Sequence, residues 1–399
     1  MILEVFLIFA GAKAAGELFV RLRLPALAGE LLVGVLLGPA VLGWVHVNNA
    51  SIALADLGIV VLLFAAGLES PIGELIAVGR AALMTSVGGV VATVVAAFGA
   101  LVALGIPGGT AAPAALALAA TSVGIAARAF GDLGAIGSPP ARVVLGAAVV
   151  DDVLVLAALP LVLRVGTSGS SAAEVITGVV GAVAFVAAVA FVGPWLARRH
   201  LSRWLEAPRT RRSPFVLSLV LCLGLAALAE RVGLAALIGA FLAGMILAET
   251  EHRASLERQM EPLFDFLVPF FFVVSGARLD PGALGDAGPG FLAAVVGAAL
   301  VAKPLGAAAG AIGLHGRQRL AVGAGMMPRG EVTLAVATGI AAAGGTSASE
   351  LYAALLAAVF LSTVLAAPLL QAVLPPGDRH PAEPRTDIPP EAFDVDEEP

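Results

Sequence analysis

Long hydrophobic stretches, separated by short polar or charged connections, occupy most of the chain. A helix needs about 17–25 predominantly apolar residues to cross the hydrocarbon core of a bilayer. Some of the stretches are short or contain Gly and Pro, but their succession is clear enough to count. The pattern predicts an all-α polytopic membrane protein with about 13 transmembrane helices. The predicted spans are 1–21, 25–43, 54–69, 81–104, 111–130, 140–163, 173–196, 214–230, 233–248, 262–278, 289–313, 319–342 and 350–373.

Basic residues are abundant on every second connection and rare on the others. With the N-terminus outside, and with bases within two residues of a span end counted on the adjacent connection, 17 of the 23 Lys and Arg residues fall on inward-facing connections and the tail, and three fall on outward-facing connections. Cytoplasmic loops of membrane proteins are enriched in Lys and Arg. The bias therefore predicts an external N-terminus and a cytoplasmic C-terminus. The remaining three bases, Lys13, Lys303 and Arg329, fall within predicted spans.

The longest connection between spans divides the chain into two blocks. Residues 197–213 contain six arginines, and six predicted spans precede the helix at 173–196 while six follow it. Because that middle helix adds one crossing, the second block starts from the opposite side of the membrane. This is the arrangement of an inverted-topology repeat, which is common in secondary transporters.

Composition excludes several classes of protein. Hydrophobic residues make up 59% of the 399 residues and charged residues 13%, with a mean hydropathy of +0.98. These values exclude a soluble globular enzyme, and the chain lacks the basic surface that a nucleic-acid-binding protein needs. The net charge of −6 belongs entirely to residues 378–399, which hold eight acids and two bases. The lone Cys222 excludes a disulfide framework.

The C-terminal segment, residues 374–399, is rich in proline and acidic residues. Such a composition is typical of a disordered tail, which we expect in the cytoplasm. Nothing in it indicates a nucleotide-binding domain. We therefore expect transport to be driven by an ion gradient or to be passive, without a cofactor.

Two adjacent carboxylates, Asp151 and Asp152, lie near the middle of the predicted span 140–163. Charged groups at such depth are costly, by about 2.5–3.5 kcal/mol each even on lenient scales. Successive helical residues point about 100° apart, so both side chains can face a shared cavity. A deep pair of carboxylates can exchange a proton for a metal cation. The alternative is a pair that only holds neighbouring helices together.

Lys303 is the expected counter-charge of this pair, because it lies deep in the predicted span 289–313 and precedes Pro304. The chain contains 21 Arg and only two Lys. Lysine can lose its proton when it is desolvated, whereas arginine effectively cannot. An Asp–Lys pair that opens on cation binding could release a proton, although a permanent salt bridge is the alternative. The other lysine, Lys13, is expected to pair with Glu17 at i, i+4 spacing.

Two predicted spans contain residues that interrupt helices. In the span 111–130, Gly124 weakens the helix next to the hydroxyl residues Thr121 and Ser122, and Pro328 to Glu331 lie in the span 319–342. These spans occupy corresponding positions in the two blocks, and discontinuous helices at such positions indicate a binding site. Freed carbonyl groups there could coordinate a cation. Arg329 and Glu331 are expected to act as structural or gating charges rather than as cation ligands.

The motifs ATSVGIAAR, GAAVVDDV, AKPLG and MMPRGEV, with LPALAGELLVGVLLGP and LLFAAGLE nearer the start, together resemble the cation:proton antiporter-2 family of bacterial Na+/H+ exchangers. Within that family the likeness is to the NapA-type antiporters, and it extends over about residues 1–373. It implies an NhaA/NapA-like fold with two crossed discontinuous helices. It also implies a multi-pass protein of the bacterial inner membrane.

The resemblance further implies a homodimer surrounded by lipid, with two domains in each protomer. Residues 1–80 and 214–288 would form a scaffold and dimer domain, and residues 81–164 and 289–373 a moving core domain. Residues 165–213 would connect them. Carried over by position, Asp152 is the expected Na+/H+ carboxylate and Asp151 the salt-bridge partner of Lys303. The two helix breaks would be lined by Thr121, Ser122, Arg329 and Glu331.

The prediction is therefore a secondary antiporter, not an enzyme, that exchanges cytoplasmic Na+ or Li+ for external H+. In the resembling family, paired aspartates mark electrogenic exchange. K+/H+ exchange at the same site is the alternative, and selectivity depends on ligand geometry that sequence does not give. An intramembrane aspartyl protease would need its two aspartates on facing helices. A receptor or assembly protein without transport is the remaining alternative.

Overall fold

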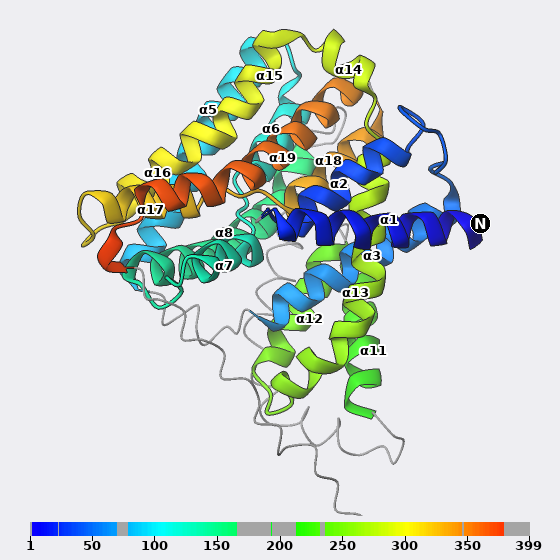
Figure 1. Ribbon diagram of the computed structural model, residues 1–399, viewed down its shortest axis with the longest axis horizontal. Helices are drawn as coiled ribbons and strands as arrows, with labels where there is room; N and C mark the ends of the chain where they lie inside the picture. Colours follow the sequence, from blue (N-terminus) through cyan, green and yellow to red (C-terminus); the bar gives the residue numbers. More distant parts are fainter. Residues whose placement is uncertain are drawn as a thin grey trace, which may run out of the picture.

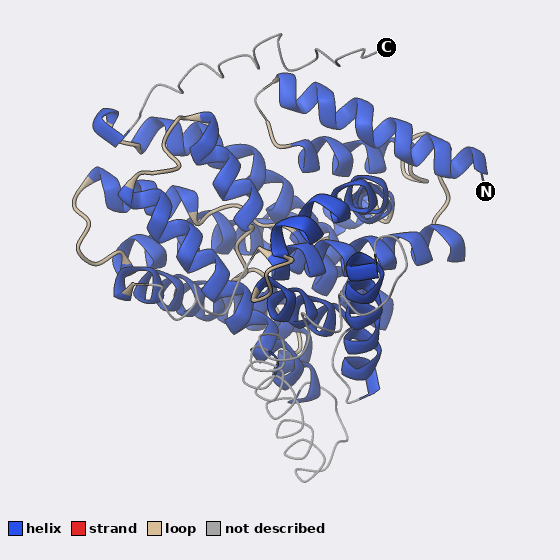
Figure 2. Cartoon of the chain, turned by 90° about the horizontal axis from the view of Figure 1, so that it is seen from below, coloured by secondary structure: helices blue, strands red, loops and turns tan. Residues whose placement is uncertain are grey.

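The computed structural model describes residues 2–22, 24–69, 79–165, 193, 213–231, 236–344 and 347–378. Within these ranges the chain is helical and contains no strand (Figure 2). The helices are α1 (Ile2–Arg21), α2 (Ala26–Leu37), α3 (Asn49–Leu68), α5 (Arg80–Ala103), α6 (Gly108–Ala117), α7 (Val123–Asp132), α8 (Pro139–Val165), α11 (Ser213–Arg231), α12 (Ala236–Ala248), α13 (Arg253–Ala277), α14 (Pro281–Asp286), α15 (Gly288–Gly297), α16 (Lys303–Gly310), α17 (Arg317–Gly325), α18 (Glu331–Ala343) and α19 (Ala348–Val373).

The all-α polytopic fold expected from the hydrophobic pattern is confirmed. Among the described helices, six are long and apolar enough to cross a membrane: α3, α5, residues 214–231 of α11, α13, the continuous run 288–310, and α19. Helices α2, α12 and α18 are shorter but also apolar. Except for Gly193, the predicted span 173–196 lies outside the described residues, as do residues 379–399 of the predicted disordered tail.

Some boundaries differ from the predicted ones for local reasons. Helix α3 begins at Asn49, five residues early, because the Asn48 side chain accepts hydrogen bonds from two backbone amides of the first turn and forms a capping box with Ser51. Helix α13 begins at Arg253, before the apolar run, and an ion pair of 2.8 Å between Arg253 Nε and Glu257 Oε1 supports its polar first turns.

The described helices pack in two groups, which Figure 1 shows on opposite sides of the molecule. In the first group, α3 packs against α12 and α13, α2 packs against α1 and α13, and α11 packs against α12. In the second group, α5 packs against α6, α8 and α16, while α19 packs against α15, α17 and α18. Smaller contacts join the groups, between α3 and α18 and between α2 and α19.

A buried hydrogen bond also joins the two groups. The Tyr352 hydroxyl of α19 donates to the Ser275 carbonyl of α13 at 2.5 Å. Ser275 lies in the last turn of α13, where a carbonyl has no partner within the helix. A tyrosine of the second group therefore supplies the hydrogen bond that a carbonyl at a helix end of the first group needs.

Glycine allows a close helix contact within the first group. A Cβ atom placed on Gly67 of α3 would collide with the Phe241 carbonyl of α12, and one placed on Gly244 of α12 would collide with the Phe64 carbonyl of α3. Small residues at such crossings let membrane helices approach backbone to backbone. Helices α3 and α12 can therefore pack this closely only because Gly67 and Gly244 have no side chains.

The expected pairing of Lys13 with Glu17 is wrong. Lys13 Nζ lies 3.2 Å from Asp265 Oδ1 of α13, and Glu17 accepts instead from Arg21 at 2.8 Å. The i, i+4 spacing was available for both pairs, but α13 crosses α1 next to Lys13 and offers a carboxylate there. The Lys13–Asp265 pair joins α1 to α13 on the outer surface of the first group.

Candidate functional site

Two helices of the second group are interrupted, at the positions where the sequence indicated breaks. The first interruption separates α6 from α7 at residues 118–122, and the second separates α17 from α18 at residues 326–330. Pro328 has no amide hydrogen and disfavours helix at the preceding residue, and the extended backbone of Ser122 ends the other break. The crossed discontinuous helices of the predicted fold are present.

The two interruptions contact each other. The Ser122 amide donates to the Pro328 carbonyl at 3.2 Å. A Cβ atom placed on Gly330 would lie 2.9 Å from the Ser122 Cβ, so only glycine allows this approach. Backbone groups that a continuous helix would use internally are thereby gathered at one point inside the protein, where they can bind a side chain or an ion.

Behind the interruptions lies a fully buried cluster centred on Asp151. Lys303 Nζ lies 2.5 Å from Asp151 Oδ2 and also donates to the Ala119 carbonyl at 2.6 Å. The Thr121 hydroxyl donates to the same carboxylate oxygen at 2.8 Å, and Ser86 donates to Oδ1 at 2.7 Å. A carboxylate with three donors, one of them a cation, is well stabilised inside a membrane protein, so the hydrogen-bonding capacity of Asp151 is already used within the cluster.

Local helix irregularity positions Lys303 in this cluster. Residues 298–302 form a single π-helical turn between α15 and α16, and Lys303 follows it directly. Pro304 cannot donate a backbone hydrogen bond into the preceding turn, which favours such a widening. Gly89 of α5 leaves the space that the lysine chain fills, because a Cβ atom there would lie 2.9 Å from Lys303 Cε.

Gly89→Ala is expected to disturb this cluster. The new methyl group would overlap Lys303, so the lysine or α5 must move, at a cost of about 1–3 kcal/mol of stability. We expect a lower melting temperature in detergent and a reduced transport rate.

The matched control is Gly99→Ala on the same helix, where an added Cβ meets nothing within 4 Å. This change should keep or slightly raise stability, because alanine is the better helix former. Equal effects of the two substitutions would show that the space beside Lys303 is not required.

Arg329 is fully buried and binds carbonyl groups rather than carboxylates. Its Nη1 donates to the carbonyls of Ala120 at 3.0 Å, Met326 at 3.2 Å and Pro328 at 3.3 Å. Its Nη2 donates to the Ala299 carbonyl at 3.3 Å in the π-helical turn. One guanidinium therefore joins both interruptions to the turn that precedes Lys303.

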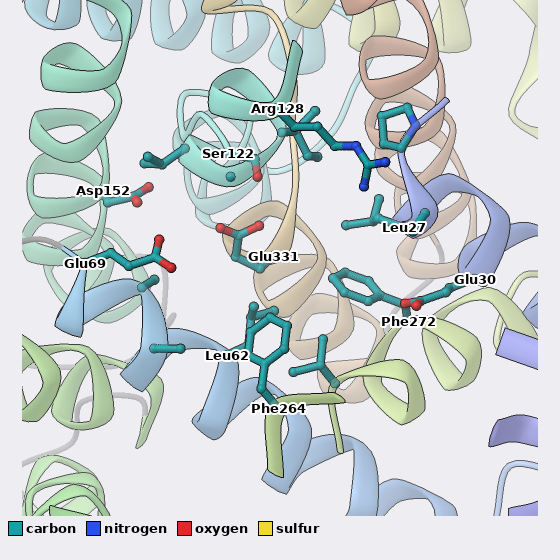
Figure 3. Close-up of a pocket in the computed structure, with 18 residues that line it drawn as sticks. Leu27, Glu30, Leu62, Glu69, Ser122, Arg128, Asp152, Phe264, Phe272 and Glu331 are labelled. Atoms are coloured by element: carbon teal, nitrogen blue, oxygen red, sulfur yellow. The ribbon is translucent and has the colours of Figure 1, made fainter. Parts of the chain in front are cut away.

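Asp152 has a different environment from its neighbour, because it lines a cavity of about 360 Å³. Figure 3 shows its carboxylate on one side of this cavity, with Glu69 and Glu331 nearby. Glu331 begins α18 and accepts a hydrogen bond from the Ser122 side chain. Residues that line the cavity are Pro25, Ala26, Leu27, Glu30, Leu62, Ala65, Ala66, Glu69, Ser122, Val123, Gly124, Ile125, Arg128, Asp152, Phe264, Val268, Phe272 and Glu331.

The structure thus separates the expected site residues into two places. Asp152, Ser122 and Glu331 line the cavity, whereas Asp151, Lys303, Thr121 and Arg329 lie in the buried cluster behind it. Sequence reasoning missed Ser86 on Asp151 and missed Glu69 and Arg128 in the cavity. Ser86 follows Thr85 in the predicted span 81–104, and a hydroxyl group within a span was the available signal for it. Glu69 and Arg128 lie at or near the ends of predicted spans, where charged residues are common and do not by themselves indicate a site.

Residues 5–374 match the family model described as "Sodium/hydrogen exchanger, transmembrane". The chain belongs to the sodium/hydrogen exchanger family. Exchanger relatives include the Na+/H+-K+ antiporter GerN of Bacillus cereus, 33% identical over 92% of this chain and 95% of GerN. The high-affinity Na+/H+ antiporter NhaS3 of Synechocystis sp. is 32% identical over 94% of this chain and 89% of its own.

A solved exchanger structure supports the same fold. The sodium proton antiporter MjNhaP1 of Methanocaldococcus jannaschii superposes with a TM-score of 0.73 at 17% identity, covering 92% of this chain and 95% of the other. Members of the exchanger family are transporters and not enzymes. This chain is accordingly a multi-pass membrane protein whose activity is cation/proton antiport.

Proposed function

We propose that this exchanger moves cytoplasmic Na+ or Li+ outward in exchange for external H+, and that Asp152 is the group that carries either one. The observation behind this assignment is the contrast between the two aspartates. Asp151 is held by Lys303, Ser86 and Thr121, whereas Asp152 lines the cavity. A carboxylate in a cavity can bind a proton or a cation but not both, so the two ions compete for it.

In the proposed cycle, the Asp151–Lys303 pair supplies a second proton. A cation that enters beside Asp152 opens the pair, and the Lys303 ammonium releases its proton to solvent. Reprotonation of Lys303 after cation release restores the pair. With one proton from Asp152 and one from Lys303 exchanged for each Na+, one net charge crosses per cycle. Each 100 mV of membrane potential then contributes about 2.3 kcal/mol per cycle.

We propose that the cycle proceeds by alternating access, with the second group of helices as the core domain and the first group as the dimer scaffold. Both interruptions and the Asp151 cluster belong to the second group, while Leu62, Ala65 and Phe264 line the cavity from the first. With the N-terminus outside, the cavity lies on the cytoplasmic side. A homodimer in the bacterial inner membrane is the proposed assembly.

The test is solid-supported-membrane electrophysiology on proteoliposomes, with rapid jumps of Na+, Li+ and K+ in turn. We expect transient currents for Na+ and Li+ that disappear in protein-free membranes, with a sign that shows net charge moving with the protons. Proton flux without current would contradict electrogenic exchange. The absence of any cation-dependent current or proton flux would contradict antiport at this site.

K+/H+ exchange is the second candidate, because the relative GerN is named a Na+/H+-K+ antiporter. The same cavity and the same aspartate would serve. Currents after K+ jumps that equal or exceed those after Na+ jumps would favour this candidate.

A further inference from the structure

The cavity that contains Asp152 carries an unexpected charge for a cation path. Its acidic lining residues are Glu30, Glu69, Asp152 and Glu331, and among the described lining residues Arg128 is the one base. Arginine stays protonated at every physiological pH. A permanent positive charge therefore lies in the space through which a cation must pass.

Arg128 is held loosely by its surroundings. It lies on α7, and its nearest ionic partner is Asp132 one helical turn further on, with 3.8 Å between Arg128 Nε and Asp132 Oδ2. The side chains of the two residues are 44% and 59% exposed. Figure 3 shows the guanidinium extending across the cavity toward Leu27, away from Asp152. The charge thus faces the aqueous space rather than the ion-binding carboxylate.

We propose that Arg128 sets the apparent cation affinity of this exchanger, with Asp132 partly offsetting its charge. This inference rests on the proposed function, in which Asp152 binds the cation within the same cavity. A fixed positive charge lowers the local concentration of cations in a cleft with low-dielectric walls. Removing a unit charge from partly hydrated surroundings near a cation site changes the binding constant by roughly three- to sixfold.

The physical role of such a charge is to limit how tightly the cation is held. The four carboxylates attract cations, and tight binding slows release, since affinity differences reside mainly in dissociation rates. Arg128 offsets part of that attraction without occupying the binding carboxylate. An arginine that merely caps the inner end of α7 would influence stability but not the cation KM.

The test measures Na+ KM and maximal rate in proteoliposomes at one alkaline pH and a clamped membrane potential. We expect Arg128→Gln to lower the KM about three- to sixfold, Asp132→Asn to raise it, and the double variant to lie between these two single variants. Arg128→Lys keeps the charge and should keep the KM. The KM differences should shrink as choline chloride raises the ionic strength.

Arg142→Gln on α8 is the matched control, because Arg142 is exposed and lies outside the described lining of the cavity. It removes the same charge and should leave the KM unchanged. An unchanged KM in Arg128→Gln, or the same shift in Arg142→Gln, would overturn the proposal. Failure of the proposed function looks different, because then the wild-type protein itself shows no cation-dependent flux.

Discussion

Asp152→Asn is expected to abolish cation-dependent proton flux in proteoliposomes. Asparagine has the size of aspartate but cannot ionise, so it neither releases a proton nor neutralises a cation in the cavity. The side chain is 3% exposed and lines the cavity, so the neutral amide fits without repacking. We expect a normal melting temperature, because this change removes a buried charge that has no ion pair with any other described residue, and with it the cost of burying that charge. Asp152→Ala should behave the same way in transport.

Asp265→Asn is the matched control for this experiment. It makes the same chemical change at an aspartate that pairs with Lys13 on the outer surface of the first helix group. Its side chain is 62% exposed, so we expect most of the flux to remain. Retention of Na+-dependent proton flux in Asp152→Asn would remove Asp152 from the proposed site.

Lys303→Gln is expected to have the second large effect, on both stability and voltage dependence. The substitution leaves the Asp151 carboxylate buried with the Ser86 and Thr121 hydroxyls but without its cation. Breaking a buried ion pair in this way typically costs about 3–5 kcal/mol. Exchange should also lose its dependence on membrane potential, because the second proton of the proposed cycle is missing. Thermal unfolding in detergent and flux at imposed potentials measure the two effects.

The double variant Asp151→Asn/Lys303→Gln separates these effects. It removes both charges of the pair, so much of the lost stability should return. Voltage dependence should not return with it. An unchanged voltage response in Lys303→Gln would exclude the lysine from proton coupling and leave it as a permanent structural partner of Asp151.

The general fold and both helix interruptions could be predicted because a bilayer requires every backbone polar group to be hydrogen-bonded within the protein, which restricts the structures that can span it. Apolar runs identify spans, and glycine or proline within a span indicates where the backbone can leave the helix. The same restriction singled out Asp151, Asp152 and Lys303, since deep charges are rare and costly. Because each of these charges is costly alone, their pairing could be expected before the structure was known.

The partners of other charged residues could not be predicted, because they depend on which helices cross. Lys13 had Glu17 at a favourable spacing, yet α13 brings Asp265 beside it. Arg329 and Glu331 are two residues apart, but one binds carbonyls behind the site while the other faces the cavity. Every residue has a backbone carbonyl, so the sequence does not indicate which carbonyls accept hydrogen bonds from Arg329.

Tyr352 has a practical consequence for following the transport cycle. The chain contains one tyrosine, and its hydroxyl joins α19 to the Ser275 carbonyl of α13 at the contact between the two helix groups. Protein grown with fluorotyrosine therefore carries a single fluorine label, at the boundary where the groups must separate if they move. Its ¹⁹F resonance would report that separation in a protein with no substitution and no attached probe.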